Sequence, residues 1–561
     1  MKFWINLNMN LTKEIKKKSW LVLFAAFGLS SSLLAEEDFF PFNPPQNFSL
    51  FIDQGLVHHP VSTANPEAQR FFDQGLTLVY GFNHDAAYWS FATAAKIDPN
   101  LAMAYWGMAL ALGSNINMTI TPSREEAAYR LIQKAMELSN QATDNEKAYI
   151  QALAERYTAD SAAKQESLNQ NYKNAMEKVA KQFPDDLDAA VLFAESALDL
   201  NPWNQWDPAG NPRPGTLAIL DVLESVLKRD PDHLGANHYY IHAIEASKYP
   251  ERALMSAHRL RRLLPQSGHI LHMPSHIYLL VGDYHLAAIC NEQAVAADRA
   301  YIKQYGMQGI YPLHYLSHNL YFLSRAYSME GRFEDAKRAG DELYSFYAPH
   351  FQKMPELEYY APTSLFVLLR FHRWQDILAF PLPTPRMAVS TILWHYGRAM
   401  ALAALNQLPE ARKEQALFIQ EKNRLRPETV YGYNKIEPIL SIADLTLKAK
   451  IAEAQGDHSA AIYQLREAIS IEDQLHYNEP PDWVLPVREN LGGVLLRSGQ
   501  YAEAEQIFRE DLNKHPRNGR SLFGLLASLK SQSRETDAFW VQREFEKAWQ
   551  YSTVSLKVAD L

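Results

Sequence analysis

The sequence predicts an all-α protein built as a row of antiparallel helix pairs. Two observations carry this prediction. The 561 residues are 47% hydrophobic and 21% charged, and glycine is scarce, which is typical of a folded helical chain. Small residues, aromatic residues and prolines also recur with a spacing of about 34 residues. A repeat array accommodates this length without one large core, because each repeat buries its apolar face against its neighbours.

Residues 1–35 are predicted to be a secretory signal peptide. Lys13 and the three lysines at 16–18 form a basic segment, and an apolar run of ten residues follows at 20–29. We expect cleavage after Ala35, so the mature chain would be exported to the periplasm or secreted. The alternative is an anchor that stays uncleaved. Residues 36–65, rich in proline, phenylalanine and asparagine, are expected to run extended over the first repeats.

Charge and cysteine content narrow the classes of partner. The formal net charge is −9 at pH 7, which argues against nucleic acid and anionic lipid. The single cysteine, Cys290, cannot form an internal disulfide, and a stack of helices does not need one. No segment after the signal peptide reaches about 18 apolar residues, so no further membrane span is expected.

The repeat is clearest near the two ends of the chain. In residues 68–100, repeat positions 4, 8, 20, 24, 27 and 32 hold Phe71, Gly75, Ala87, Phe91, Ala94 and Pro99. The best single match comes later, with Leu491, Gly492, Gly499, Tyr501, Ala504, Phe508 and Pro516. Small residues are needed where the two helices of a pair cross closely, and proline ends the second helix. Pro231 and Pro265, 34 residues apart, fix the frame in the middle of the chain.

These residues resemble the tetratricopeptide repeat (TPR), and over most of residues 66–550 the chain is similar to exported bacterial members of the TPR superfamily. The resemblance implies a right-handed superhelical solenoid. In each pair the first helix (helix A) would line a concave groove, and the second (helix B) would lie outside. We expect an N-terminal array at 66–310 and a C-terminal array at 311–561. The family implies a fold and a habit of binding, not a reaction.

Histidines gather in one stretch of this array. Residues 233–318 contain ten of the 19 histidines, and three pairs are spaced i, i+4. The pairs are His238/His242, His272/His276 and His314/His318. In the frame of the two prolines, the first two pairs both occupy positions 5 and 9, and His269 occupies position 2. These positions of helix A face the groove of a TPR, so two neighbouring helices are expected to present the same pair to one surface.

The third pair lies on the next predicted helix A. If Gly331 occupies position 15, His318 is at position 2 and Arg325, a candidate groove residue, is at position 9. Two imidazoles one helical turn apart can bind one metal ion, and a neighbouring helix about 8–10 Å away can supply more ligands. The three pairs and His269 are therefore candidate ligands of a transition metal, Zn or Cu, with one or two ions. Glu245, at position 12 of the first helix, is the candidate catalytic base or a further ligand.

A metal-free adaptor is the alternative function. The groove would then bind a peptide, a partner protein or a small molecule, with Tyr239 and Tyr278 beside the histidines. Residues 201–215 contain four prolines and two glycines and are expected to form a loop. Trp203 and Trp206 in this loop either face the groove or attach the loop to its own hairpin. A metal-dependent hydrolase or oxidase is the third hypothesis, and the sequence does not decide whether the chain is an enzyme.

Overall fold

The fold is that of a computed structural model, which describes residues 44–46, 48–51, 57–160, 162–307, 311–384, 386–426 and 428–561. The predicted signal peptide, residues 1–35, lies outside the described residues. Residues 57–65 contain no helix or strand and lead directly into the first described helix, α2 (Pro66–Tyr80).

Helices account for most of the described chain. After α2, the helices up to the middle of the chain are α3 (His84–Ile97), α4 (Ala102–Leu112), α5 (Pro122–Leu138), α6 (Asp144–Ala154), α7 (Gln165–Gln182), α8 (Leu187–Leu198), α9 (Thr216–Arg229), α10 (Leu234–Ile244), α11 (Leu254–Leu263), α12 (Gly268–His272), α13 (Pro274–Leu280) and α14 (Tyr284–Tyr305).

The second half continues in the same way. Its helices are α15 (Ser317–Glu330), α16 (Phe333–Tyr347), α17 (Thr363–Arg370), α18 (Trp374–Ala379), α19 (Ala388–Ala404), α20 (Leu408–Lys422), α21 (Ile436–Ala454), α22 (His458–Glu472), α23 (Val487–Arg497), α24 (Tyr501–Lys514), α25 (Gly519–Ser531) and α26 (Glu535–Ala548). A π-helical turn at Pro312–Leu316 leads into α15. Short 3₁₀ turns lie at Ser139–Gln141, Pro250–Ala253, Ala348–His350, Pro355–Tyr360 and Val558–Asp560. Between α20 and α21, β1 (Val430–Tyr431) and β2 (Asn434–Lys435) form a small antiparallel hairpin.

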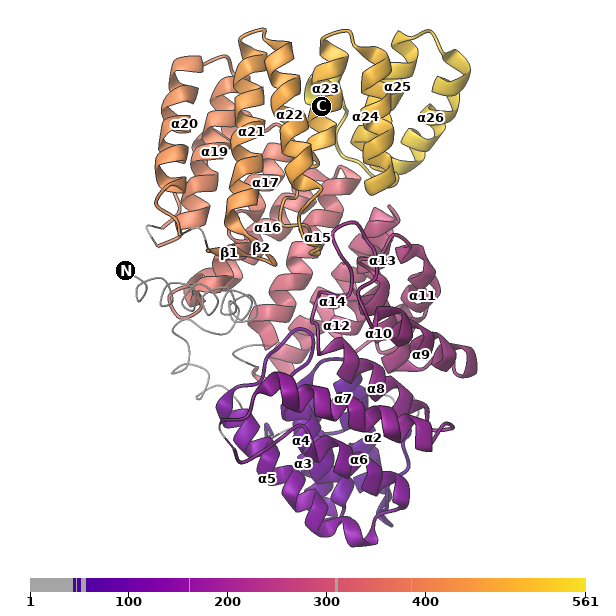
Figure 1. The fold of residues 1–561 in the computed structure, drawn as a ribbon. Helices are drawn as coiled ribbons and strands as arrows, with labels where there is room; N and C mark the ends of the chain where they lie inside the picture. The colour runs from indigo at the N-terminus through magenta and orange to yellow at the C-terminus, as the bar shows by residue number, and fades with distance from the viewer. Residues whose placement is uncertain are drawn as a thin grey trace, which may run out of the picture.

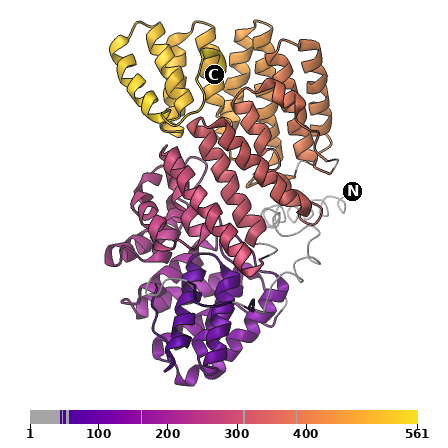
Figure 2. The same cartoon turned by 180° about the vertical axis from the view of Figure 1, so that it is seen from behind.

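Consecutive helices pack as antiparallel pairs, and the pairs stack side by side into a solenoid (Figure 1). The N-terminal helices form one end of the molecule, α19–α26 form the other, and α12–α16 lie between them in both views (Figures 1 and 2). The turn inside a pair repeats as well. Gly331 after α15 and Gly499 after α23 have φ of +82° and +79°, a conformation that glycine adopts without strain. The predicted all-α fold of TPR-like antiparallel helix pairs is confirmed.

The small residues of the repeat lie where a large ring crosses two helices. A Cβ atom on Gly75 or on Gly107 would overlap the ring of Phe91, which packs between α2 and α4. Phe508 packs in the same way against Gly492 and Gly524 near the other end of the chain. The close crossings that the sequence predicted for repeat positions 8 and 24 are therefore present in both places.

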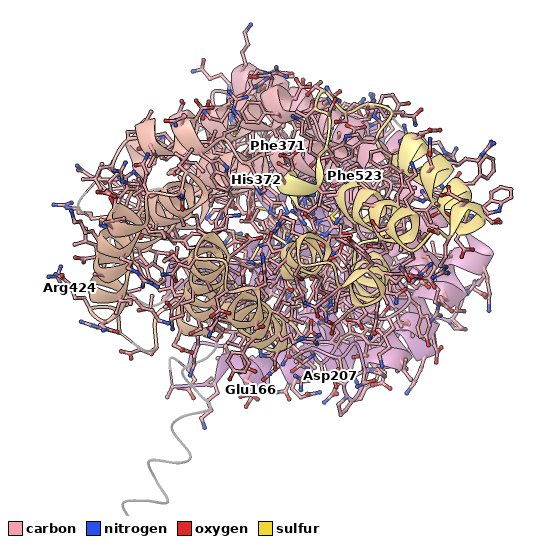
Figure 3. The ribbon with its side chains drawn as sticks, turned by 90° about the horizontal axis from the view of Figure 1, so that it is seen from above. Glu166, Asp207, Phe371, His372, Arg424 and Phe523 are labelled. Atoms are coloured by element: carbon pink, nitrogen blue, oxygen red, sulfur yellow. The ribbon has the colours of Figure 1, made fainter. Side chains whose placement is uncertain are left out.

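The array coils far enough for distant segments to meet. The Tyr284 hydroxyl donates to Pro516 O at 3.0 Å, and Ser552 Oγ donates to Gly331 O at 3.1 Å. The partners in these bonds are 232 and 221 residues apart in sequence. Figure 3 looks down onto the C-terminal helices, with Arg424 at the outer edge. The C-terminal repeats thus cover helices in the middle of the chain.

Two further predictions concern the whole chain. Among the described residues, no helix has both the length and the apolar character that a membrane span requires. The division into arrays at 66–310 and 311–561 stays a prediction, and α14 packs against α15 across this point.

Candidate metal centre

The first pair of histidines lies on α10. His238 and His242 stand one turn apart on the same face of the helix, and both side chains are buried. His238 Nδ1 lies 2.6 Å from the backbone oxygen of Tyr80, and His242 Nδ1 lies 2.9 Å from Glu245 Oε1. A carbonyl and a carboxylate can only accept, so both rings donate from Nδ1 and keep an unshared pair on Nε2.

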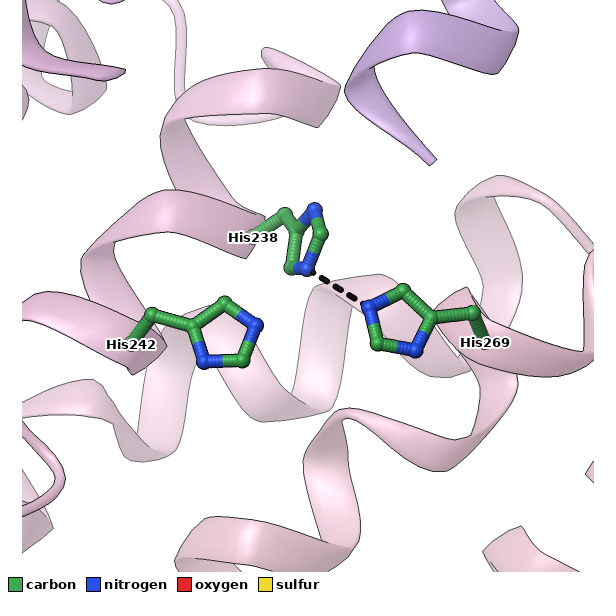
Figure 4. Close-up of side chains that lie close together, drawn as sticks. All are labelled: His238, His242 and His269. Atoms are coloured by element: carbon green, nitrogen blue, oxygen red, sulfur yellow. Dashed lines mark hydrogen bonds between the residues drawn. The ribbon is translucent and has the colours of Figure 1, made fainter. Parts of the chain in front are cut away.

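His269 on α12 completes the first histidine trio (His238, His242 and His269). The ligand nitrogens of these rings all lie within 4.8 Å of one another. His269 Nε2 is 3.1 Å from His238 Nε2, and the three rings converge from two helices (Figure 4). His242 Nε2 and His269 Nδ1 are buried and have no hydrogen-bond partner among the described residues. A metal ion bound between these rings would satisfy the unshared pair on His242 Nε2.

The second histidine trio (His272, His276 and His318) repeats this plan on α12, α13 and α15, again within 4.8 Å. His272 Nε2 and His276 Nε2 are 2.8 Å apart. α12 ends at His272, because Pro274 has no N–H to donate and begins α13, but the two rings still share one face. Five of the six trio histidines are buried, and His318 is partly exposed.

The hydrogen bonds around the second trio fix where its protons are. Asn291 donates through Nδ2 to Ala287 O at 2.8 Å, so its Oδ1 is the acceptor for His272 Nδ1 at 2.7 Å. His276 Nδ1 lies 2.5 Å from Glu245 Oε2 and donates to it. Both rings therefore face each other through Nε2 lone pairs, with no proton between them in the neutral state.

Burial keeps these imidazoles neutral. Desolvation lowers the pKa of His238 and of His276 to about 3, and that of His242 to about 4. The same cause lowers the pKa of His269, His272 and His318 well below its usual range. The neutral ring is the form that binds a metal ion. Near pH 7 a shared proton is thus an unfavourable way to satisfy the facing lone pairs.

Glu245 connects the two trios. Its Oε1 accepts from His242 Nδ1 in the first trio, and its Oε2 accepts from His276 Nδ1 in the second. The Tyr477 hydroxyl donates to the same Oε2 at 3.0 Å from a loop 232 residues away in sequence. Burial raises the pKa of Glu245, and its bonds with His242 and Tyr477 oppose this. A carboxylate on Nδ1 orients the ring and makes Nε2 a better ligand.

A phenyl ring lies against each trio. The Phe82 ring is 4.5 Å from that of His238, and the Phe322 ring is 4.4 Å from that of His272. Phe82 occupies the turn between α2 and α3 with φ of +55°, a strained conformation for a residue with a side chain. These rings exclude water, which strengthens electrostatic interactions with a bound cation.

The spacing of the nitrogens suits a transition metal. Two nitrogens bound to one Zn²⁺ at about 2.0–2.1 Å in tetrahedral geometry stand about 3.3 Å apart. The Nε2 atoms of His238 and His269 are 3.1 Å apart, and those of His272 and His276 are 2.8 Å apart. Both distances are within about 0.5 Å of the separation that a shared ion requires.

A third cluster with metal-ligand chemistry, formed by His59, Asp186 and Asp188, is already satisfied by the protein. His59 Nδ1 and the Tyr80 hydroxyl lie at 2.8 and 2.5 Å from the two oxygens of Asp188. Asp186 Oδ2 accepts from the Tyr149 hydroxyl at 2.9 Å, and its other oxygen caps α8. Asp188 Oδ1 also lies 3.3 Å from Nε2 of His233, the N-cap residue of α10, so we interpret this cluster as a hydrogen-bonded support for the start of α10.

The third predicted pair is divided by the structure. His318 belongs to the second trio, whereas His314, on the π-helical turn, belongs to neither. A π turn closes i→i+5 rather than i→i+4 hydrogen bonds, so the i, i+4 spacing across this turn does not have the geometry that it has within α10.

The two loop tryptophans lie against α10. The Trp203 ring is 5.3 Å from that of His242, edge to face, and 5.5 Å from that of Tyr433 in the β1–β2 hairpin. Trp206 Nε1 donates to Ala243 O at 2.8 Å. Trp203 therefore lies beside the first trio, and Trp206 attaches the loop to the helix.

The other candidate groove residues differ in their contacts, and the Tyr239 ring lies 5.2 Å from that of His238 in the first trio. Tyr239 is buried, with its ring 5.6 Å from that of Phe82. Tyr278 points away from the trios, and its hydroxyl lies 2.7 Å from His258 Nδ1. Arg325 is buried and donates to the backbone oxygen of Val484.

Sequence reasoning missed four residues that complete the centre: Phe82, Asn291, Phe322 and Tyr477. Phe82 and Asn291 stand on the helix turn and the helix B behind the trios, where the repeat frame assigns no groove position. Tyr477 comes from the covering C-terminal repeats, and no local pattern marks it.

Comparisons with known proteins add little to this geometry. No protein-family model and no curated protein matches the chain. Among solved structures, the APC/C hetero-tetramer Cut9–Hcn1 aligns with 87% of this chain and 74% of its own, at 12% identity and a TM-score of 0.29. The human IFIT1 dimer with m7Gppp-AAAA aligns over 88% and 96%, at 13% identity and a TM-score of 0.33. The P58(IPK) TPR domain aligns over 83% and 99%, at 11% identity and a TM-score of 0.21. At these scores the similarities carry no argument about the function of this chain.

Proposed function

We propose that this chain is an exported TPR-fold protein that binds a transition metal, Zn or Cu, through its histidine trios, for metal handling or metal-dependent chemistry. The contact between His272 and His276 supports this most strongly. Their Nε2 atoms are 2.8 Å apart while both Nδ1 atoms donate elsewhere. A bound cation satisfies both lone pairs, and a proton does so poorly because burial lowers the pKa of His276 to about 3.

The type of ligand supports the choice of metal. Neutral imidazoles suit Zn, Cu, Ni and Fe(II), and the only cysteine of the chain is Cys290, on α14. Three nitrogens leave one position of a tetrahedral ion open, as catalytic rather than structural sites do. The role of Glu245 as a catalytic base remains a prediction. Both of its oxygens accept hydrogen bonds from histidines, so one of these bonds would have to break before Glu245 could take a proton from water. Export rests on the basic and apolar pattern of residues 13–35.

Metal analysis of the purified full chain tests this proposal, with one variant at each histidine of the His314/His318 pair. We expect Zn or Cu to be retained through gel filtration, reduced in His318→Ala and unchanged in His314→Ala. Circular dichroism of each variant checks that the helices remain. Less than about 0.1 ion per chain in the wild-type protein after growth in metal-replete medium would refute metal binding.

A metal-free adaptor that binds a peptide or a partner protein is the second proposal. Five of the six trio histidines are buried, so a peptide in the groove would have to use other side chains. Capture of a periplasmic partner that survives a chelator and the loss of His272 would favour this function over metal binding.

A further inference from the structure

The two trios are in direct contact. The ring centroids of His242 and His276, which belong to different trios, are 5.7 Å apart, and those of His269 and His272 are 6.1 Å apart. Within the trios the corresponding distances run from 4.7 Å for His272 and His318 to 6.2 Å for His242 and His269. The six rings therefore form one continuous cluster, with no layer of other side chains between those rings.

The repeat itself produces the two trios. Each trio takes positions 5 and 9 from one repeat, on α10 for the first trio and on α12 and α13 for the second, and position 2 from the next repeat. His269 supplies position 2 for the first trio, and His318 supplies it for the second. One coordination plan is thus used twice in succession, and an accidental cluster of buried histidines would have no reason to follow it.

One carboxylate serves both trios. Glu245 accepts from His242 and His276, whereas His238 and His272 donate to separate acceptors, Tyr80 O and Asn291 Oδ1. An ion on either trio would fix the orientation of its ligand ring and so the position of the Glu245 carboxylate that holds this ring. The same carboxylate would then already be placed to hold the ligand ring of the other trio.

If the proposed metal binding holds, we infer that the six histidines form one dinuclear centre, with one ion on each trio and Glu245 coupling the two ions. The six ligand nitrogens are more than the four that one tetrahedral ion can bind. Two ions are compatible with trios in direct contact, because ions in two-metal sites lie about 3.5–4 Å apart. Each ion keeps one position for water or a small anion. Glu245 is a positioning residue in this centre and touches both sets of ligands through Nδ1.

Native mass spectrometry of the full chain titrated with Zn²⁺ tests the inference without any variant. We expect saturation at two ions per chain, with the one-ion species remaining minor at half saturation because the first ion favours the second. Saturation at one ion, or a one-ion species at the statistical share of half, would overturn the coupled dinuclear centre and leave metal binding itself intact. No bound ion at all would instead refute the proposed function.

Variants then separate the two sites. His238→Ala should leave one ion, held by the second trio. Glu245→Gln should weaken both ions by roughly 10–100-fold, whereas Asn291→Ala should weaken only the ion at His272. Co²⁺ provides a readout that depends on geometry, because the d–d absorption of both ions should shift in Glu245→Gln and that of one ion in Asn291→Ala. A Glu245→Gln protein in which only one site changes would contradict the shared role of this carboxylate.

Discussion

Replacing Gly268 with alanine should loosen the packing of α12 on α14, next to the first trio. A Cβ atom at Gly268 would overlap the carboxylate of Asp298, which packs against this position. Asp298 is fully buried and accepts from the Tyr311 hydroxyl at 3.0 Å and from Asn319 Nδ2 at 2.7 Å. The carboxylate must therefore move out of its bonds, or α12 must shift and carry His269 with it.

The size of the effect follows from these contacts. Overpacking a close contact costs about 1–3 kcal/mol. Displacing Asp298 leaves buried donors unpaired, at about 1–3 kcal/mol for each lost partner. Alanine returns up to about 1 kcal/mol through helix propensity. We expect Gly268→Ala to reduce the local free energy of opening by about 3 kcal/mol.

Hydrogen exchange measured by mass spectrometry on peptides from residues 268–305, in the presence of a chelator, reports this free energy. Gly81→Ala is the matched control, because its Cβ would meet Ile270 and Ser267 at 3.6 Å, an ordinary contact, and φ there is not positive. In an Asp298→Ala background, Gly268→Ala should cost almost nothing. Costs for the two substitutions that add to within about 0.5 kcal/mol would refute the proposed clash.

Three further predictions address other parts of the molecule. Burial raises the pKa of Asp298 to about 7, so between about pH 4 and 7 the folded state holds a proton that the unfolded state has lost. The free energy of unfolding should therefore fall as pH rises through this range. Urea titrations should show a flatter pH dependence for Asp298→Asn. Arg156 is buried with its Nη2 2.7 Å from Asp199 Oδ2, so Arg156→Met should lower stability by about 3–5 kcal/mol, and adding Asp199→Asn should restore most of the loss, as thermal melts would show. Trp203→Ala removes the ring beside His242 and should speed metal transfer to a chelator roughly tenfold, whereas an unchanged rate would show that this ring does not limit release.

The repeat frame predicted the fold because its rules are local. Glycine at positions such as Gly75 and a ring such as Phe91 define a helix crossing within one repeat, and that crossing is present. The sequence marks the turn conformation less clearly than the helix crossing, because Phe82 takes the same left-handed conformation as Gly331 although it has a side chain. Local composition therefore predicts that a turn occurs without predicting which residue bears its strain.

The site was predictable only as far as the frame extends. Repeat positions 5, 9 and 2 predicted that His238, His242 and His269 face the same groove. In the structure their ligand nitrogens lie within 4.8 Å of one another. The i, i+4 spacing predicted His314 and His318 as equally good ligands, because a π turn before α15 cannot be recognised from residue spacing. Tyr477 was out of reach for another reason: its contact depends on the pitch of the whole superhelix, which is a sum of small rotations between many repeats.

Each trio is divided between two successive repeats, and this division has a consequence for the distance between the two proposed ions. In a loop-built site, the separation of two ions depends on loop conformation and can drift with insertions. In the proposed centre it would instead be tied to the rotation and translation that carry one helix A onto the next, which the packing of whole helices holds constant. A chain with one more helix A bearing histidines at the same positions would add one further candidate trio to the cluster. The stacking of the repeats would then set the distances between neighbouring ions.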